Sequence, residues 1–348
     1  QLFGDHMMIS NATGCSSIYS GNLPTTPYAK DEKGHGPAWA NSLFEDNAEF
    51  GLGMRFSIDQ QTATAKALLE GLKSELGDVA EKIMSNPQKT DAEIDAQREN
   101  VKALRAKLAG MNSKEAKELD NLADYLIKKS VWILGGDGWA YDIGYGGLDH
   151  VLASGENVNV MVFDTEMYSN TGGQASKASN IGEVCQFAAA GKETSKKSLS
   201  EIAMSYGYVY VAQIALGANP AQAVKAITEA EAYPGPSLII GYAPCELHGI
   251  AKGGMNHCQD EMKKAVKAGY WNLFSFNPAL KAEGKNPFTL TSKAGDGSYQ
   301  EFLNNEARYT RLIKPFPERA EKLFAKSEET AKARYTHLEK LVKLYGED

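Results

Sequence analysis

The sequence is poor in cysteine, in excess positive charge and in long apolar runs. Four cysteines in 348 residues are too few and too irregularly spaced for a disulfide scaffold. Lysine and arginine number 37 against 44 aspartate and glutamate residues, and this net charge of −7 argues against a nucleic-acid-binding surface. No apolar run approaches the roughly 20 residues that span a bilayer, and the first residues lack the pattern of a signal peptide. These absences favour a cytoplasmic protein that binds neither membrane nor nucleic acid.

The sequence does contain two apolar runs, residues 131–134 and 158–163, that each end in a polar, glycine-rich turn. They are typical of buried parallel strands, and residues 143–152 between them suit a crossover helix. Further strands are expected at residues 7–10, 208–214 and 237–242. We therefore predict an α/β fold: a doubly wound, mostly parallel sheet with a helical insert and a carboxyl-terminal extension.

The expected domain organisation follows changes in composition. Residues 1–270 form the α/β domain, and residues 59–130 within it form an insert of two or three helices. Thr90 and Glu93 have the spacing of a capping box inside that insert. Residues 271–348 form the extension, first irregular and without strands, then helical from about residue 318. We also expect a helix at residues 39–50 and helical packing around Cys185.

Asp137 lies between two glycines directly after the first apolar run, and Thr165 and Asn170 follow the second. Open α/β sheets bind ligands at the carboxyl ends of their strands. A carboxylate with neutral oxygens suits Mg²⁺ shared with a diphosphate. The alternative is an ordinary Asp-Gly turn, as expected for Gly295-Asp296-Gly297, which follows no apolar strand. The strand context favours a metal site at Asp137.

Two motifs carry a family resemblance: Gly-Gly-Asp-Gly-Trp-Ala-Tyr-Asp-Ile-Gly-Tyr-Gly-Gly-Leu-Asp-His at residues 135–150 and Asp-Thr-Glu-Met-Tyr-Ser-Asn-Thr-Gly-Gly-Gln-Ala-Ser-Lys at residues 164–177. They resemble the thiamine-diphosphate domain of the pyruvate:ferredoxin (flavodoxin) oxidoreductases. The resemblance extends to residues 4–19, 22–28, 41–51, 242–245 and 269–274. It covers nearly the whole chain, which is similar to the carboxyl-terminal part of that much longer family chain.

The resemblance implies a set of site residues. Asp137, the Thr165 hydroxyl and the Met167 carbonyl would hold Mg²⁺ on thiamine diphosphate, and Asn170 would be the catalytic side chain nearest the substrate. The residues implied to line the cofactor are Cys15, Gly136, Asp137, Gly138, Trp139, Thr165, Glu166, Met167, Tyr168, Ser169 and Asn170.

The resemblance also implies that Cys15 and Cys245 are two of the four ligands of a [4Fe–4S] cluster. The other two would form a Cys-x-x-Cys pair upstream of residue 1. Cys185 and Cys258 have no such role, and a zinc site at His248, His257 and Cys258 is disfavoured because no Cys-x-x-Cys or clean histidine pair is present.

The implied activity is oxidative decarboxylation of pyruvate with coenzyme A to acetyl-CoA and CO₂. Electrons pass singly through [4Fe–4S] clusters to ferredoxin or flavodoxin. The implied partners are the remaining domains of the same enzyme and a second copy in a homodimer, and the piece alone is expected to be inactive. Three alternatives stay open: a related 2-oxoacid:ferredoxin oxidoreductase with another substrate, a non-redox thiamine enzyme, and an inactive thiamine-binding or assembly module.

Overall fold

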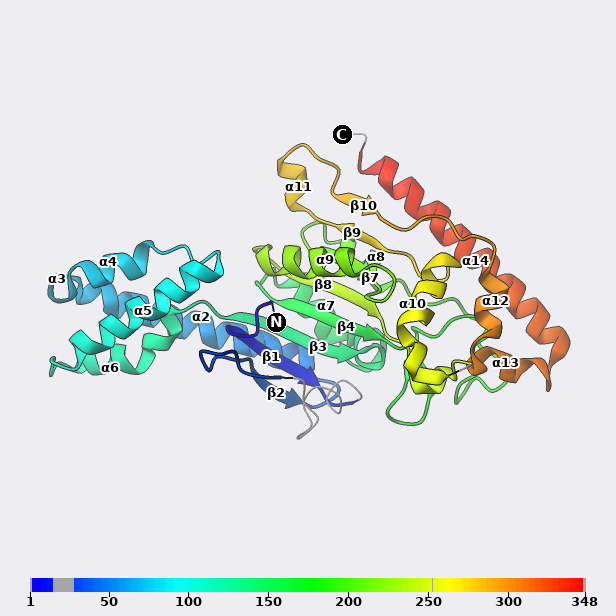
Figure 1. Ribbon diagram of the computed structural model, residues 1–348, viewed down its shortest axis with the longest axis horizontal. Helices are drawn as coiled ribbons and strands as arrows, with labels where there is room; N and C mark the ends of the chain where they lie inside the picture. The colour runs from blue at the N-terminus through cyan, green and yellow to red at the C-terminus, as the bar shows by residue number, and fades with distance from the viewer. Residues whose placement is uncertain (1, 15–27, 252, 347–348) are drawn as a thin grey trace. The chain divides into compact units, whose positions relative to one another are not determined.

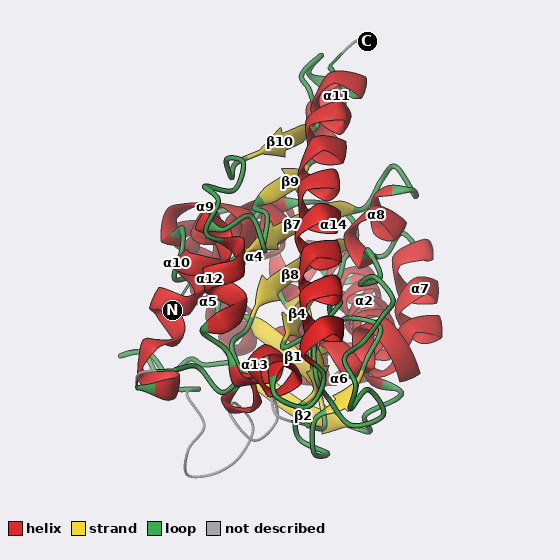
Figure 2. Cartoon of the chain, turned by 90° about the vertical axis from the view of Figure 1, so that its right-hand side faces the viewer, coloured by secondary structure: helices red, strands yellow, loops and turns green. Residues whose placement is uncertain are grey.

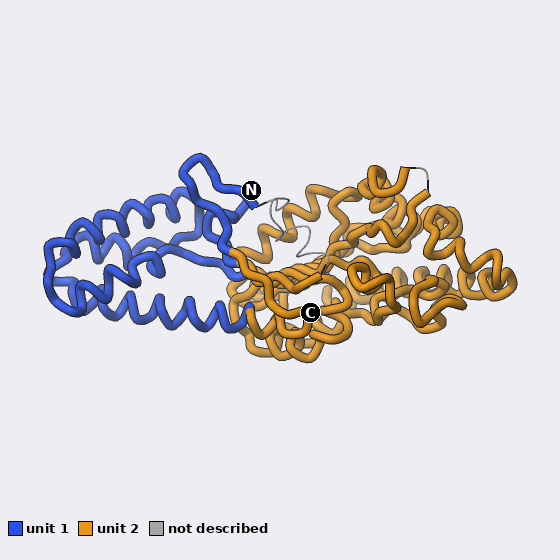
Figure 3. Tube along the Cα trace, turned by 90° about the horizontal axis from the view of Figure 1, so that it is seen from below, with its two compact units in different colours: residues 1–8, 28–38, 51–131 blue, residues 9–27, 39–50, 132–348 orange. Residues whose placement is uncertain are grey.

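The structure, a computed structural model, describes residues 2–14, 28–251 and 253–346 (Figure 1). The chain divides into two compact units, coloured separately in Figure 3. The helical unit comprises residues 1–8, 28–38 and 51–131, and the sheet unit comprises residues 9–27, 39–50 and 132–348. No described helix is long and apolar enough to cross a membrane.

Within the described residues, eight strands form one sheet in the order β10-β9-β7-β8-β4-β3-β1-β2. Their bounds are β1 Met7–Ala12, β2 Ala38–Ser42, β3 Ser130–Gly136, β4 Asn159–Asp164, β7 Tyr210–Ile214, β8 Ser237–Tyr242, β9 Phe274–Phe276 and β10 Phe288–Leu290. The central strands β3, β4, β8 and β7 are parallel, with Gly136 opposite Phe163 and Asp164 opposite Tyr242. Every residue of β7 and β8 is buried, as expected for parallel strands covered on both faces.

Helices cover both faces of this sheet, which confirms the predicted α/β class. Figure 2 shows α9 (Pro220–Ala232) on one side of the strands, and α7 (Tyr145–Ala153) and α8 (Leu199–Met204) on the other. The helix α9 begins where Asn219 accepts a hydrogen bond from the backbone N–H of Gln222, ahead of a proline in the first turn. A π-helical turn, η2 (Gly138–Ile143), precedes α7.

Residues 271–317 are not strandless, and that expectation was wrong. Strands β9 and β10 extend the sheet antiparallel beyond β7. Each is only three residues long, too short for its alternation to show as a period. The remaining helices after β8 are η3 Glu246–His248, η4 Gly254–His257, α10 Cys258–Lys267, α11 Ala279–Ala282, α12 Tyr299–Asn304, α13 Ala307–Ile313 and α14 Pro317–Leu344. The long terminal helix α14 matches the helix expected from residue 318.

The helix expected at residues 39–50 was also wrong in its first half. Ala38–Ser42 is the edge strand β2, and the helix α2 (Asn47–Gly71) begins only at Asn47. Side chains tie this edge to β1, because Asn11 donates to Asn41 at 3.0 Å and the Thr13 hydroxyl donates to the Ser42 carbonyl at 2.5 Å.

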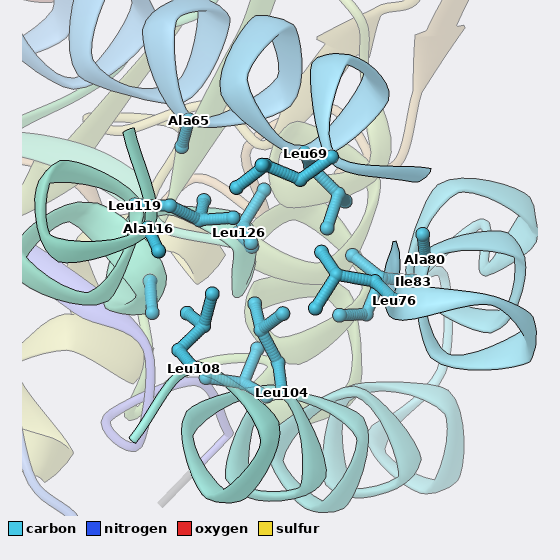
Figure 4. Close-up of a cluster of buried hydrophobic side chains, with 13 residues drawn as sticks. Ala65, Leu69, Leu76, Ala80, Ile83, Leu104, Leu108, Ala116, Leu119 and Leu126 are labelled. Atoms are coloured by element: carbon cyan, nitrogen blue, oxygen red, sulfur yellow. The ribbon is translucent and has the colours of Figure 1, made fainter. Parts of the chain in front are cut away.

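The helical unit has a core made almost entirely of alanine, leucine, isoleucine and valine (Figure 4). Its helices after α2 are α3 Lys73–Leu76, α4 Asp78–Ser85, α5 Asp91–Leu108, α6 Lys114–Leu122 and η1 Ala123–Leu126. The capping box at Thr90 and Glu93 is confirmed: the threonine side chain accepts from the Glu93 N–H, and the glutamate side chain accepts from the Thr90 N–H.

Candidate functional site

The sheet brings Asp137 and Thr165 together at one edge. Asp137 directly follows β3 and Thr165 directly follows β4, and these two strands are neighbours in the sheet. Cys245 lies three residues after β8, the next strand beyond β4. The prediction of a shared strand edge therefore holds for these three residues. Cys15 lies outside the described residues.

Three oxygens of the predicted metal site lie close together. The hydroxyl Oγ1 of Thr165 is 2.7 Å from Oδ1 of Asp137 and 3.0 Å from the Met167 carbonyl oxygen. The Thr165 backbone N–H donates to the same Asp137 oxygen at 3.0 Å, and the Ser169 hydroxyl lies 2.8 Å from Thr165 Oγ1. A carboxylate, a hydroxyl and a carbonyl are the hard oxygen ligands that Mg²⁺ prefers.

The carboxylate of Asp137 is buried among neutral groups. Only 1% of the residue is exposed, and its other oxygen accepts from the Ser176 hydroxyl at 2.9 Å. Within the described ranges, no lysine, arginine or histidine forms an ion pair with Asp137. Burial, and then the nearby charge of Asp164, raises the pKa of Asp137 to about 7. A buried carboxylate with only neutral donors around it is well suited to a bound cation.

A cavity of about 230 Å³ opens beside these oxygens. It is lined by Thr13, Gly14, Phe44, Gly136, Asp137, Gly138, Phe163, Thr165, Met167, Tyr168, Ser169, Asn170 and Thr171. Eight of the eleven predicted cofactor residues are therefore in its wall, including the exposed Asn170. Met167 and Tyr168 form the short strand β5, which pairs with β6 (Gln174–Ala175), so that the Asn170 loop is a hairpin. Gly138 leaves room for the Tyr168 ring, since a Cβ there would lie 2.6 Å from it.

Trp139 is not in the cavity wall. The indole is fully buried, and it packs between Gly135 and Gly144 so closely that a Cβ on either glycine would overlap the ring. Two of the glycines in the first motif are thus required by the tryptophan. Its predicted contact with the cofactor stays a prediction.

Glu166 is also absent from the cavity wall, and its carboxylate points into a buried ionic network. The network contains Lys196 at 3.1 Å, Arg308 at 2.8 Å, the Tyr270 hydroxyl at 2.5 Å and the Asn180 amide at 2.7 Å. Burial alone would raise the pKa of Glu166, but the charges of Lys196 and Arg308 outweigh it and lower the pKa to about 2. Its φ of 63° is left-handed, a strain of about 1–3 kcal/mol for a non-glycine residue.

Lys196 joins the residues on both sides of Thr165. Its ammonium is 2.8 Å from Asp164 and 3.1 Å from Glu166, and Asp164 also accepts from the Tyr141 hydroxyl at 2.7 Å. Sequence reasoning missed both cations. Lys196 stands in a Ser-Lys-Lys-Ser run that resembles a solvated surface. Arg308 lies in the region expected to be irregular, so neither gave a signal.

His248 is a further residue that the sequence did not reveal. Its Nδ1 accepts from the Cys245 backbone N–H at 3.4 Å, so its Nε2 donates to the Thr165 carbonyl at 2.8 Å. Burial, followed by the charge of Arg308, lowers the pKa of His248 to about 3, and the ring is neutral. His257 instead lies 3.5 Å from Asp260. No group of three His, Cys, Asp or Glu side chains able to hold a metal ion occurs among the described residues.

The described cysteines differ in environment. Cys185 is buried in a turn, not in a helix as expected, and burial raises the pKa of its thiol to about 12. Cys245 and Cys258 are partly exposed and free. Of these three cysteines, only Cys245 follows a strand at the edge of the sheet where Asp137 and Thr165 lie.

Comparison with known proteins identifies the relatives of this chain. Residues 119–240 match the family "Thiamine pyrophosphate enzyme, C-terminal TPP binding domain". The chain is 56% identical to pyruvate:ferredoxin oxidoreductase of Moorella thermoacetica, over 98% of this chain and 30% of that protein. It is 52% identical to a putative pyruvate-flavodoxin oxidoreductase of Synechocystis (99% and 28%) and 51% identical to the pyruvate-flavodoxin oxidoreductase of Klebsiella pneumoniae (98% and 29%).

Among solved structures, a 2-oxoglutarate:ferredoxin oxidoreductase from Magnetococcus marinus aligns with 70% of this chain and 55% of its own, at 15% identity and a TM-score of 0.41. That likeness is too weak to support an argument. The chain spans about 30% of the length of the curated relatives it matches. The resemblance found in the sequence is thereby confirmed: nearly the whole chain is similar to a segment of the pyruvate:ferredoxin and pyruvate-flavodoxin oxidoreductases, and residues 119–240 match the thiamine-pyrophosphate-binding family.

Proposed function

We propose that this chain is the thiamine-diphosphate-binding part of an enzyme that oxidises pyruvate with coenzyme A to acetyl-CoA and CO₂. The electrons leave singly through [4Fe–4S] clusters to ferredoxin or flavodoxin. Support for pyruvate as the substrate comes from the names of relatives that are 51–56% identical to this chain.

The observation that carries the proposal is the convergence of Asp137, Thr165 and Met167 beside a cavity at the carboxyl ends of two parallel strands. The donor set fits a magnesium ion, and the buried Asp137 carboxylate has no cationic partner among the described side chains. Asp137, the Thr165 hydroxyl and the Met167 carbonyl would hold Mg²⁺. Gly136 and Gly138 allow backbone to come close to the diphosphate.

Thiamine diphosphate, when bound, supplies the carbanion chemistry of decarboxylation. The chain itself supplies binding, orientation and electrostatics. Asn170 lies in the cavity wall at the tip of the β5–β6 hairpin, where its amide can donate a hydrogen bond to negative charge that develops on the substrate. We therefore assign Asn170 the catalytic role.

We further propose that Cys15 and Cys245 are two of the four ligands of a [4Fe–4S] cluster. The position of Cys245 beside the cofactor loops supports this role, and the burial of Cys185 argues against one for that thiol. The proposed partners are the remaining domains of the same enzyme, a second copy in a homodimer, and ferredoxin or flavodoxin. The sparse cysteines favour a reducing, cytoplasmic setting.

The metal site is tested with Asp137→Ala in the full-length enzyme. This variant removes the only carboxylate proposed on the metal, so the purified enzyme should lose its thiamine diphosphate. Asp296→Ala is the matched control, because Asp296 has the same glycine neighbours but only surface partners, Ser298 and Lys267. Thiamine content that is equal in the two variants would show that the site is assigned wrongly.

The cluster ligands are tested by serine substitution followed by iron counting and EPR. Cys245→Ser should lose one cluster, whereas Cys185→Ser and Cys258→Ser should keep them all. A full cluster signal without Cys245 would refute the assignment. Turnover of pyruvate compared with turnover of 2-oxoglutarate separates the proposal from a related 2-oxoacid enzyme, and absence of both would indicate an inactive binding module.

A further inference from the structure

A strained residue separates two of the proposed metal ligands. Three non-glycine residues of the described chain have positive φ, namely Gln88, Glu166 and Phe187, and only Glu166 is buried. It stands between Thr165 and Met167. A left-handed residue turns the backbone sharply, and here Thr165 Oγ1 comes to lie 3.0 Å from the Met167 carbonyl oxygen. The convergence of the two ligands thus depends on an unfavourable conformation at Glu166.

The side chains on either side of Thr165 point to the same cation. Lys196 binds Asp164 at 2.8 Å and Glu166 at 3.1 Å, whereas the Thr165 side chain points the other way, to Asp137. His248 holds the carbonyl of Thr165 from a third direction. Asp164, Thr165 and Glu166 are therefore each fixed by a partner from a distant part of the sequence.

Arg308, in α13, holds the other oxygen of Glu166. Its Nη1 is 2.8 Å from Oε2, and the Tyr270 hydroxyl donates to the same oxygen at 2.5 Å. Both members of the Glu166–Arg308 pair are fully buried, and removing one member of a buried ion pair is strongly unfavourable for the other. A glycine at position 166 would reach the same φ without strain, but it would have nothing to hold it there.

We propose that Glu166, held by Lys196 and Arg308, is a positioning residue that locks the Thr165–Met167 turn in the conformation that binds the magnesium diphosphate. The proposal rests on the proposed function, because it assigns the turn to that ligand. Glu166 acts through the turn and not on the substrate, since its carboxylate points away from the cavity.

The test compares Glu166→Gln with the wild type in the full-length protein, after removal of bound cofactor. Glutamine keeps the shape of the side chain but loses the charge that the two cations hold. Binding of Mg²⁺ with thiamine diphosphate, measured by calorimetry, should weaken about tenfold, or about 1.4 kcal/mol. Hydrogen exchange of the backbone amides of residues 164–170, measured without ligand, should become faster.

Glu183→Gln is the matched control. Glu183 is fully buried and lies 3.5 Å from Nη1 of Arg308, but it has no hydrogen bond to the residues of the turn. Its variant should keep the affinity within about twofold and leave exchange at residues 164–170 unchanged. Arg308→Lys keeps the charge but loses the fork geometry, so it should weaken binding about threefold with a smaller rise in exchange. If Glu166→Gln does not fold, the same two measurements on Arg308→Lys test the proposal.

Affinity and exchange both equal to the wild type in Glu166→Gln, or in Arg308→Lys where that variant is used, would overturn the positioning role. An equal loss in Glu183→Gln would overturn it too, because the effect would then belong to the network as a whole. Failure of the proposed function gives a different result: wild-type protein and Asp137→Ala would have the same affinity for Mg²⁺ with thiamine diphosphate.

Discussion

The helical unit and the region around Glu166 both have buried cores, but the two cores are of opposite kinds. In the helical unit the core is aliphatic, and the buried polar side chain of Gln97 is satisfied by the carbonyls of Ile83 and Leu126. Beneath the Thr165–Met167 turn, Arg308 and Lys196 are buried with several carboxylates. The aliphatic core tolerates exchange of similar side chains, whereas the ionic core requires each partner.

The ionic core contains more carboxylates than cations. Burial raises the pKa of Glu183 to about 8 and that of Glu306 to about 7, even though Arg308 opposes both shifts. Glu166 contacts both cations, Lys196 at 3.1 Å and Arg308 at 2.8 Å, and their charges keep its pKa low. The arrangement therefore favours ionisation of the carboxylate in the turn over that of Glu183 and Glu306.

The largest effect should come from Arg308→Met. It leaves Glu166 buried with one cation fewer, which should lower the free energy of unfolding by about 3–5 kcal/mol. Urea denaturation of the cofactor-free protein gives the value, and the affinity for Mg²⁺ with thiamine diphosphate should fall as well. A loss below about 1 kcal/mol would remove the distinction between the two cores.

Leu104→Ala makes the corresponding change in the helical unit. Leu104 is fully buried in the cluster of Figure 4, and a cavity in its place should cost about 2–5 kcal/mol of the stability of that unit. The loss should appear as faster hydrogen exchange in α5 and α6. Cofactor affinity should stay unchanged, and a parallel loss of affinity would show that the aliphatic core also controls the site.

Glu183→Gln tests whether the buried carboxyls of the ionic core make the stability of the protein depend on pH. The pKa of the Glu183 carboxyl is near 4.5 in the unfolded chain, and burial raises this pKa to about 8 in the folded protein. The unfolding free energy of the wild type should therefore fall as pH rises through this range. The variant lacks this contribution, so its stability relative to the wild type should improve by about 2 kcal/mol between pH 5 and 8. Thermal melts without metal test this, and parallel profiles would contradict it.

The smallest effect is expected at the start of α5. Thr90→Ala removes the side chain that accepts from the Glu93 N–H, which should cost about 1 kcal/mol. Thr90→Ser is the control and should restore most of the loss. A loss confined to exchange in the first turn of α5 would agree with a local cap, whereas a change in the cofactor site would not.

The sequence predicted those parts of the fold that depend on a run or period of apolar residues, or on a short local motif. Apolar runs revealed β3, β4 and β8, and the spacing of Thr90 and Glu93 revealed a helix start. The strand ends led to Asp137 and Thr165. The strands β9 and β10 were missed because each has only three residues. The strand β2 (Ala38–Ser42) was missed because it lies at the edge of the sheet, is only partly buried and has no long run of apolar residues. The ionic partners of Glu166 were missed because the sequence alone does not distinguish a buried lysine or arginine from a solvent-exposed one.

Trp139 restricts the order in which substitutions can be accepted in the motif of residues 135–150, because Gly135 and Gly144 both pack against its ring. Neither Gly135 nor Gly144 can gain a side chain while the indole occupies the space between them. A smaller residue at position 139 would free that space, but it would leave a void beside η2 until a glycine was also replaced. Any viable path therefore passes through a less stable intermediate, so the three positions should behave as one unit when variants of the motif are selected together.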